Sequence, residues 1–486
     1  MKQSILIGLD IGTTNIKAAA YFENGKLIAE ASHRYPIWYP QQGWVEQDPK
    51  DWERSSIAAL TSVFQQLGSD SRLVAGLALS THAPGFVPLD KNHRVLLERV
   101  PIWQDERSLV QAEALLEEIG TDWVGLGTPM ASFAAKLRWF SESHLDLVQS
   151  ARYALGVKSY MTYWLTGKFA TDPSSEPGDE VREERICTAC GWSPEQFAPV
   201  YPATTVIGEL RQELVDEMGL KNRIPVVLGL NDGASATLAN GALSVGEAVI
   251  SLGTNGVVFL VSDSPIPSAE RFEKALFCWP YLEGRWIAGG QTKTGACSLD
   301  WIASILKDPS VDIDIDTLLE EASETPMGSG GVIFLPYLMG SGTPNDDPAV
   351  SGAVLGLTMR QTRGDLIRAV LEGVAFTLRD VQEELEGYGL SIDELWITGG
   401  GARSKLWRDI MAQVLNRTLK YTKVDSSLGA AMLASVGVGI HGDIDTARQL
   451  MTPKPMINQV DRQMVEVYDR IYREFTKMRD FILGLS

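Results

Sequence analysis

The sequence predicts an α/β protein built from two related lobes. Three observations lead to this fold class: a length of 486 residues, strand-like runs that alternate with helical patterns, and two copies of one glycine corner. A chain of this length exceeds one ordinary core, so we expect two domains. Alternating strands and helices are typical of α/β architecture. We place the division within residues 241–246, which gives domains of residues 1–244 and 245–486.

The two glycine corners have the same construction. Residues 5–14 read Ile-Leu-Ile-Gly-Leu-Asp-Ile-Gly-Thr-Thr and residues 248–255 read Ala-Val-Ile-Ser-Leu-Gly-Thr-Asn, and each leads into a second apolar run. Both patterns predict a β-hairpin. Glycine lets the backbone of the corner approach an anion closely. Hydroxyl and backbone N–H groups can then donate hydrogen bonds to the phosphate oxygens. Two such corners, each opening half of the chain, predict lobes that hold a polyphosphate between them.

The first lobe continues with alternating elements. After the hairpin of residues 4–21 we expect a third strand, a helix whose apolar residues fall three and four apart, and a buried strand, at 26–32, 49–67 and 73–80. Further predicted elements are helices at 108–119, 132–143 and 157–165, a loop at 172–179, and a short buried strand at 225–230 that runs into Asn231-Asp232-Gly233.

The second lobe opens with the hairpin of residues 247–261. Its later elements are predicted as a long helix at 362–385, a strand at 394–398, a helix from about Arg403 and a small-residue helix at 428–436 that suits close packing. The last helix, 460–483, carries an apolar stripe, which indicates core or an oligomer seam.

Composition excludes several classes of function. The net charge of −19 argues against nucleic acid or an anionic membrane as a partner, although local donors and a metal ion can still bind an anionic nucleotide. The sequence has no run of about 18 apolar residues, so we predict no membrane span. Four cysteines indicate a reducing compartment, and we expect a cytoplasmic protein. Cys187 and Cys190 lack a second pair, which favours two ordinary thiols over a zinc or redox site.

Asp10 ends the first strand beside the first corner. Its carboxylate could orient a hydrated magnesium ion bound to ATP phosphates, or it could accept N–H groups of its own loop. Lys17 lies on the returning strand, where it could contact phosphate or pair with Asp10.

Asp232 follows a buried strand and precedes a glycine and a helix. The carboxyl ends of such strands face the ligand crevice of an open α/β sheet. There the carboxylate could accept a proton from a substrate hydroxyl while a γ-phosphoryl group is transferred. The alternative is a helix N-cap.

Two further sets of residues suit ligands. Gly399-Gly-Gly401 would let a nucleotide lie against bare backbone, but its spacing does not fit a Rossmann dehydrogenase. Ser80-Thr-His82 and Trp103-Gln-Asp105-Glu-Arg107 supply an aromatic plate, an acceptor and a cationic fork for a polyhydroxylated ligand. The alternative for the second segment is a surface Asp–Arg pair with Trp103 in the core.

These motifs resemble the FGGY carbohydrate kinases of the sugar kinase/Hsp70/actin superfamily over essentially the whole chain. The first hairpin is similar to that family's first phosphate motif, and Gly43-Trp-Val-Glu-Gln-Asp-Pro49 is similar to a segment before its first helix. Residues 352–357 followed by 365–372 fit the C-terminal signature. Residues 131–139 resemble the other signature, with Lys136 and Trp139 in place and Phe133 as a departure.

The resemblance implies two actin-like ATPase (ribonuclease H-like) lobes with the active site in the cleft between them. It also implies ATP-dependent phosphorylation of a hydroxyl on a small sugar, sugar acid or polyol, with Mg²⁺. Asp232 would be the catalytic base and, with Asp10, serve the magnesium site. The resemblance implies that the nucleotide is bound by Gly12, Thr13, Thr14, Gly253, Thr254, Gly295, Gly400 and Ser404, and we predict Lys17 beside them. Asp105 and Arg107 match sugar-contacting positions of the family, and we predict His82, Trp103 and Asp232 as further sugar contacts.

The substrate is predicted only as a class. Xylulose and gluconate kinases usually carry Met-His where this chain has Ala83-Pro84, and His82 could substitute. Lys158 and the Asp232-Gly233 pair are more similar to the residues of gluconate kinases than to those of pentulose kinases. Lys158 could pair with the carboxylate of a sugar acid, or it could equally be a solvated helix residue. Alternatives are a xylulose- or ribulose-type pentulose kinase and a non-catalytic, nucleotide-binding actin-like protein. A homodimer, with the last helix as its seam, is a further expectation.

Overall fold

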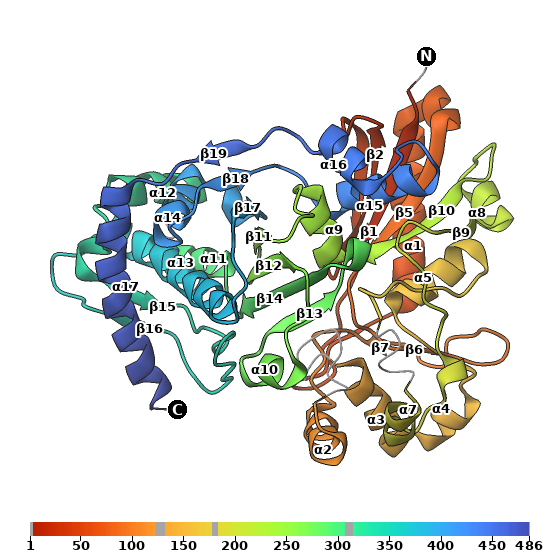
Figure 1. The fold of residues 1–486 in the computed structure, drawn as a ribbon, viewed down its shortest axis with the longest axis horizontal. Coiled ribbons are helices and arrows are strands. Elements are labelled where there is room, and N and C mark those ends of the chain that lie inside the picture. The colour runs from red at the N-terminus through yellow and green to blue at the C-terminus, as the bar shows by residue number, and fades with distance from the viewer. Residues whose placement is uncertain (1–2, 122–131, 177–182, 307–313, 486) are drawn as a thin grey trace.

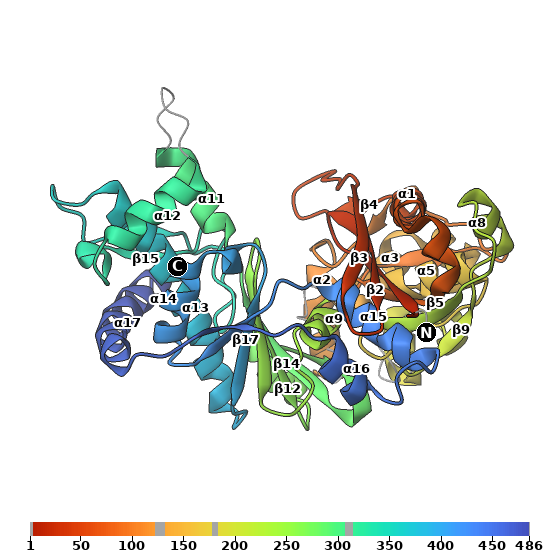
Figure 2. The same cartoon turned by 90° about the horizontal axis from the view of Figure 1, so that it is seen from above.

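The computed structural model describes residues 3–121, 132–176, 183–306 and 314–485. Two lobes, each built around a mixed β-sheet, lie beside one another, with the N-terminal strands in one and the long C-terminal helix in the other (Figures 1 and 2). The predicted two-lobed α/β fold is therefore confirmed.

The first sheet has six strands in the order β3-β2-β1-β5-β10-β9. Strands β1, β5 and β10 run parallel, while β2, β3 and β9 each run antiparallel to their neighbours. Their bounds are Ile5–Ile11 (β1), Asn15–Phe22 (β2), Leu27–Arg34 (β3), Val74–Thr81 (β5), Val206–Glu209 (β9) and Pro225–Asn231 (β10).

The second sheet repeats this plan. Its order is β13-β14-β12-β11-β17-β18-β19, and its central five strands, β14-β12-β11-β17-β18, have the order and directions of β3-β2-β1-β5-β10. The bounds are Glu247–Leu252 (β11), Gly256–Ser262 (β12), Phe277–Pro280 (β13), Trp286–Thr292 (β14), Glu394–Thr398 (β17), Leu419–Tyr421 (β18) and Met456–Asn458 (β19). Both predicted hairpins are present, and each glycine corner joins the first two strands of its sheet.

Helices cover both sheets, and short strands complete the lobes. The first lobe holds α1 (Pro49–Leu67), α2 (Leu109–Ile119), α3 (Phe133–Ser143), α4 (Leu145–Ser150), α5 (Val157–Thr166), α7 (Glu184–Cys190), α8 (Gln212–Glu217) and α9 (Asp232–Ala239). Its short strands are β4 (Glu46–Gln47), β6 (Val87–Leu89), β7 (Val100–Pro101) and β8 (Tyr153–Leu155). Both thiols of α7 are buried, and Cys190 packs in an aromatic core with Phe86, Phe140 and Trp192.

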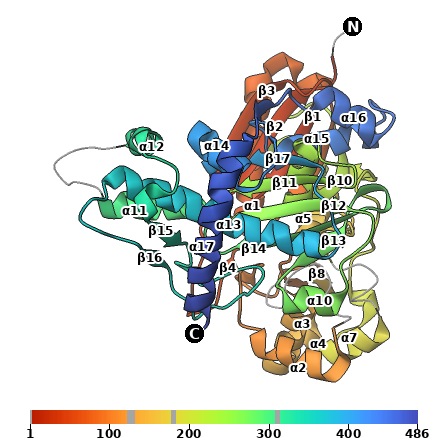
Figure 3. The ribbon, with the colours of Figure 1, turned by 60° about the vertical axis from the view of Figure 1, so that its left-hand side comes forward.

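The remaining elements follow in chain order. They are α10 (Ser268–Glu273), α11 (Cys297–Leu306), α12 (Ile315–Glu324), β15 (Ile333–Leu335), β16 (Ala353–Leu355), α13 (Arg363–Gly387), α14 (Lys405–Val414), α15 (Ser426–Gly437), α16 (Ile444–Met451) and α17 (Arg462–Leu483). The stripe of α17 is mainly core, because Tyr468, Tyr472 and Phe475 are buried around Phe376 of α13 (Figure 3). Met464 of the same stripe is 42% exposed, so fewer residues of the stripe are buried than predicted.

The helices that follow the last parallel strand of each sheet cross between the lobes. Helix α15 follows β18 of the second sheet but packs on β1 and β5 of the first, and α16 lies with it (Figure 2). Helix α9 packs against α15 and shares a core with Val249 and Phe259 of the second sheet. Helices α15 and α16 of the predicted second domain thus lie with the first lobe.

Candidate active site

A cavity of about 860 Å³ opens between the lobes. Residues from β1, β2 and α9 line one side, and residues that follow β17 and β18 line the other. Of the predicted site residues it is lined by Asp10, Lys17, Asp232 and Gly400; further lining residues include Gly233, Ser251, Gly399, Arg403, Lys423, Asp425 and Ser426. Two acids and a glycine-rich backbone segment therefore share one cavity.

Asp10 lies at the end of β1 and reaches the neighbouring strand. Its Oδ1 accepts a hydrogen bond of 2.7 Å from Ser80 Oγ at the end of β5. Exclusion of water raises the pKa of Asp10 to about 6, and the hydroxyls of Ser80 and Ser426 oppose that rise. This carboxylate accepts its hydrogen bond from the neighbouring strand and lines the cavity. It is not the turn aspartate bound to its own loop that was the alternative prediction.

Lys17 has other partners than those predicted. Its Nζ lies 2.7 Å from Asp425 Oδ2 and 2.5 Å from Glu30 Oε2. The alternative of a pair with Asp10 is therefore not found: Asp10 and Lys17 are register partners on β1 and β2, but the ammonium turns toward Asp425 at the start of α15. A phosphate contact by Lys17 stays a prediction. Lys17 ties the first sheet to the crossing helix at the edge of the cavity.

Asp232 is the first residue of α9 and is not the N-cap. Asn231 takes that position, since its side chain accepts from Ala234 N at 2.7 Å. The carboxylate of Asp232 accepts from Gly233 N at 2.8 Å and is otherwise directed to the cavity that it lines. Exclusion of water, together with the charge of Asp10, raises the pKa of Asp232 to about 7. A carboxylate with this pKa can exchange a proton near neutral pH.

The first glycine corner is held by side chains around it. Gly12 N donates to Asn15 O at 3.1 Å, and Tyr35 donates its hydroxyl proton to Gly12 O. Gln47 Nε2 donates to Thr13 O at 2.6 Å, and Trp103 Nε1 donates to Thr13 Oγ1 at 2.9 Å. Thr14 is exposed beside them. The predicted aromatic residue Trp103 thus supports the phosphate corner.

The second corner is closed by a neighbouring loop. Gly253 N donates to Asn255 O at 3.0 Å, Gly295 N donates to Thr254 O at 2.7 Å, and Ala296 N donates to Gly253 O at 2.7 Å. A Cβ on Gly295 would lie 2.5 Å from the carbonyl carbon of Asn255, so only glycine fits this contact. Gly253, Thr254 and Gly295 are therefore brought together, as expected for one nucleotide-binding corner.

The triple glycine follows β17. Gly399 has φ of +98°, and a Cβ on Gly400 would meet no atom within 4 Å, which leaves open space above the backbone. Ser404 caps α14, because its Oγ accepts from Trp407 N, and a nucleotide contact by this residue stays a prediction. The helix begins at Lys405 since a short 3₁₀ turn at residues 401–403 precedes it.

Asp105 and Arg107 form a clamp instead of an open ligand pair. Arg107 donates to Asp105 through Nε and a terminal nitrogen, both at 2.7 Å, and to Glu46 at 2.6 Å. Asp105 Oδ2 also accepts from Val45 N at 2.7 Å, and the guanidinium stacks on Trp44 at 3.6 Å. The residues of the predicted Gly43–Pro49 segment are thereby fastened to the 103–107 segment, and a sugar contact by this pair stays a prediction.

His82 is buried directly after β5. Its ring packs edge-on against Trp52, and burial lowers the pKa of His82 to about 3, so the imidazole is neutral. Within the part of the chain that the structure describes, neither ring nitrogen has a hydrogen-bond partner. His82, Trp103, Asp105 and Arg107 do not line the large cavity, and a sugar contact by any of them stays a prediction.

Lys158 fits neither sequence interpretation. Its side chain is fully buried, and its Nζ donates to the carbonyl oxygens of Leu79, Leu228 and Leu230. It is therefore neither solvated nor directed at a substrate carboxylate.

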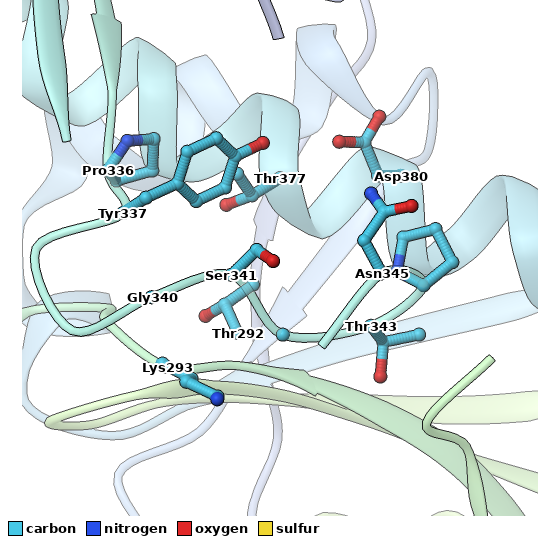
Figure 4. Close-up of a pocket in the computed structure, with 12 residues that line it drawn as sticks. Thr292, Lys293, Pro336, Tyr337, Gly340, Ser341, Thr343, Asn345, Thr377 and Asp380 are labelled. Atoms are coloured by element: carbon cyan, nitrogen blue, oxygen red, sulfur yellow. The ribbon is translucent and has the colours of Figure 1, made fainter. Parts of the chain in front are cut away.

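A second cavity, of about 10 Å³, lies between the end of β14, residues 340–345 and α13 (Figure 4). Lys293 and Asp346 form an ion pair of 3.0 Å near it. This space holds at most one water molecule, so it is not a nucleotide or sugar site.

Comparison with known proteins identifies the family. The model of the FGGY carbohydrate kinase N-terminal domain matches residues 5–239, and that of the C-terminal domain matches residues 248–438. The chain belongs to the FGGY family of carbohydrate kinases. This FGGY kinase is 30% identical to the xylulose kinase of Escherichia coli (strain K12) over 88% of this chain and 89% of that one, and 26% identical to the gluconokinase of Bacillus subtilis (strain 168) over 99% of both. The crystal structure of xylulose kinase from Rhodospirillum rubrum superposes with a TM-score of 0.88 at 27% identity and 99% coverage of both chains.

These matches confirm an actin-like, two-lobed carbohydrate kinase that transfers a phosphoryl group from ATP. They give no support to a non-catalytic actin-like protein, and both sugar and sugar-acid kinases are among the relatives. Among the described residues, none of the helices combines the length and apolarity that a bilayer crossing requires. The residues that the sequence interpretation missed are Arg403, Lys423 and Asp425; the last two follow β18 at the carboxyl end of a parallel strand, a position that could have indicated them.

Proposed function

We propose that this FGGY kinase binds ATP in the 860 Å³ cavity and phosphorylates a sugar hydroxyl placed against Asp232. The observation that carries the proposal is that Asp10 and Asp232 line the same cavity as the bare backbone at Gly399 and Gly400 of the other lobe. The corners at Gly12 and Gly253 would hold opposite ends of the phosphates. Residues 1–244 would then supply most sugar contacts, and residues 245–486 most adenosine contacts.

In the proposed reaction Asp232 acts as the general base. A sugar hydroxyl oxygen forms a bond to the γ-phosphorus, the bond from that phosphorus to the β-phosphate oxygen breaks, and the hydroxyl proton passes to the carboxylate of Asp232. ADP and the sugar phosphate leave. Such transfer depends on positioning and on neutralised charge more than on covalent help from the protein. A pKa of about 7 lets Asp232 accept the proton and release it again near neutral pH.

Asp10 and Asp232 fit a magnesium site. The two carboxylates line one cavity, and the negative charge of Asp10 is one cause of the raised pKa of Asp232. Oxygen ligands and one or two carboxylates are what Mg²⁺ uses when it also binds substrate phosphates. When bound, the ion would neutralise phosphate charge.

The substrate class remains that of the relatives. Because Lys158 is buried, it gives no reason to prefer a sugar acid over a neutral sugar as the substrate. The relatives include both a xylulose kinase and a gluconokinase. We propose a small sugar or sugar acid of these two kinds as the acceptor.

The test is a coupled assay of ADP release with Mg²⁺-ATP and a panel of xylulose, ribulose, gluconate and glycerol. We expect ADP to appear with one acceptor class. With that acceptor, Asp232→Asn should lower kcat by about 10²–10⁴-fold, while calorimetry shows nearly unchanged ATP affinity. Lys405→Gln, on an exposed side chain of α14, serves as the control. Near-normal turnover by Asp232→Asn would show that another group is the base.

A further inference from the structure

One buried cation lies beneath the two acids of the cavity. Lys158, on α5, donates from Nζ to the carbonyl oxygens of Leu79 at 3.2 Å, Leu228 at 3.1 Å and Leu230 at 2.8 Å. Its side chain is 0% exposed. An ammonium group has three donors, and all three are used on main-chain oxygens of two strands. A long polar side chain is not buried in this way without partners that compensate its lost hydration.

The acceptors lie where two parallel strands depart from regular pairing. The register of β10 against β5 shifts between Val227 and Leu230. Gly229 within that shift has φ of +78°, and a Cβ there would lie 1.7 Å from Leu79 O, so only glycine allows the strands to approach so closely. The irregularity turns carbonyl groups out of the sheet ladder, and the Lys158 ammonium binds them instead.

The end of each strand that Lys158 binds is linked to one acid of the site: Asp10 of β1 accepts a hydrogen bond from the end of β5, and Asp232 follows β10. Leu79 precedes Ser80, whose hydroxyl donates to Asp10. Leu230 precedes Asn231, the N-cap of α9, and Asp232 is the first residue of that helix. One side chain therefore contacts the backbone just before Ser80, which holds Asp10, and two residues before Asp232.

A second link runs through Asp172, whose Oδ1 lies 3.9 Å from Lys158 Nζ. Its Oδ2 accepts from the amide and the hydroxyl of Ser174. Ser174 Oγ in turn accepts from Asn231 N at 3.0 Å, and Asn231 Nδ2 donates to Ser174 O at 2.7 Å. These groups are all buried, so the turn before α9 is held from the strand side and from the loop side.

We infer that Lys158 is a positioning residue for phosphoryl transfer: it fixes the ends of β5 and β10 so that the carboxylates of Asp10 and Asp232 meet the same reacting groups. This inference rests on the proposed function. The geometry needs a lysine, because three acceptors around one nitrogen suit a tetrahedral ammonium, whereas the guanidinium of arginine is a planar fork. A misplacement of about 1 Å at such a site can cost about 10²-fold in rate.

The experiment measures kcat, both KM values and Tm for Lys158→Met and Lys158→Arg, each per amount of folded enzyme. We expect both variants to lower kcat by about 10²-fold, with the KM for ATP within about twofold of wild type, because the adenosine side of the cavity is on the other lobe. The control is Arg368→Met, which removes a buried cation of the second lobe that donates to the carbonyls of Ala322 and Thr325 and pairs with Glu372 at 2.9 Å. It should lower Tm and leave kcat unchanged.

Equal kcat values for wild type and folded Lys158→Met would overturn the inference, since a residue that only stabilises the fold changes Tm alone. If Lys158→Met does not fold, Ser174→Ala tests the same turn with a smaller change, and an unaltered kcat there would also overturn it. The proposed function fails separately: it is refuted when Asp232→Asn keeps wild-type turnover, whatever the Lys158 variants do.

Discussion

Asp10 and Asp232 are kept in a state that costs folding stability. Both carboxylates line the cavity, and exclusion of water raises the pKa of each, to about 6 for Asp10 and to about 7 for Asp232. Between pH 4 and pH 7 the folded protein therefore binds protons that the unfolded chain has released. The contribution of these two carboxylates to the free energy of unfolding therefore falls as pH rises through this range, because they bind more protons in the native state than in the unfolded state. The site gives up stability in exchange for a carboxylate that titrates near neutral pH.

Asp232→Asn should therefore stabilise the protein at alkaline pH. The shift of about three pKa units corresponds to at most about 4 kcal/mol, at 1.36 kcal/mol per unit. We expect the Tm of Asp232→Asn, measured without nucleotide or Mg²⁺, to exceed that of wild type at pH 8 and to equal it near pH 4. Asp146→Asn, at an exposed position on α4, is the control for the loss of one negative charge. A Tm of Asp232→Asn below wild type at pH 8 would contradict the raised pKa.

Single residues were predictable where the strand-end rule applies. Asp10 and Asp232 both end or follow parallel strands, and the structure places both in the cavity. Asp425 obeys the same rule after β18, but that strand has only three residues and gives a weak sequence pattern. The contacts of Lys158 were not predictable, because they depend on the register shift of β10 that no local pattern reports.

At the scale of elements, the two crossing helices decide how the lobes join. A Cβ on Gly429 of α15 would lie 2.0 Å from Ser235 O of α9, and a Cβ on Gly8 of β1 would lie 1.8 Å from Ser427 O. The helix thus packs on bare backbone at both contacts. Because α9 begins with Asp232, the fit of α15 also sets where the proposed base stands.

Gly429→Ala should lower Tm and activity together. One methyl group would overlap backbone atoms of α9, and overpacking of this kind costs about 1–3 kcal/mol. The matched control is Gly387→Ala at the end of α13, where a Cβ meets no atom within 4 Å and alanine is about 1 kcal/mol better in a helix. Thermal unfolding of the two variants makes the comparison. An unchanged Tm for Gly429→Ala would show that the two helices can separate without cost.

Most element bounds followed from hydrophobic periodicity. The helix Pro49–Leu67 and the strand Glu394–Thr398 lie where the pattern placed them, because the helix buries one continuous face and the strand is buried on both faces. The small-residue composition of residues 428–436 correctly indicated close packing. It could not indicate that the partner is the sheet of the other lobe. Small residues in a helix show that another element can pack closely against it, but they do not show which element that is.

The whole molecule is a repeated sheet plan around one cleft. The repetition was predictable, because the sequence patterns of both glycine corners and both hairpins can be recognised. The cavity of about 860 Å³ was not, because its volume depends on how far apart the two sheets stand. That volume is within the range of small-molecule sites, about 300–1,000 Å³. The cavity is open, however, and water that reaches Asp232 would compete with the sugar hydroxyl for the phosphoryl group.

We therefore expect the lobes to close when both substrates are bound. Closure expels water from the reacting groups and brings the corners at Gly12 and Gly253 onto the same phosphates. Small-angle scattering on Asp232→Asn, which should bind without turning over, should show a smaller radius of gyration with Mg²⁺-ATP and the accepted sugar than with no ligand. Scattering of Lys405→Gln without ligands controls for surface charge. A radius of gyration that stays constant while calorimetry reports both ligands bound would mean that the cleft is already in its reactive form, and that water is excluded by the sugar itself.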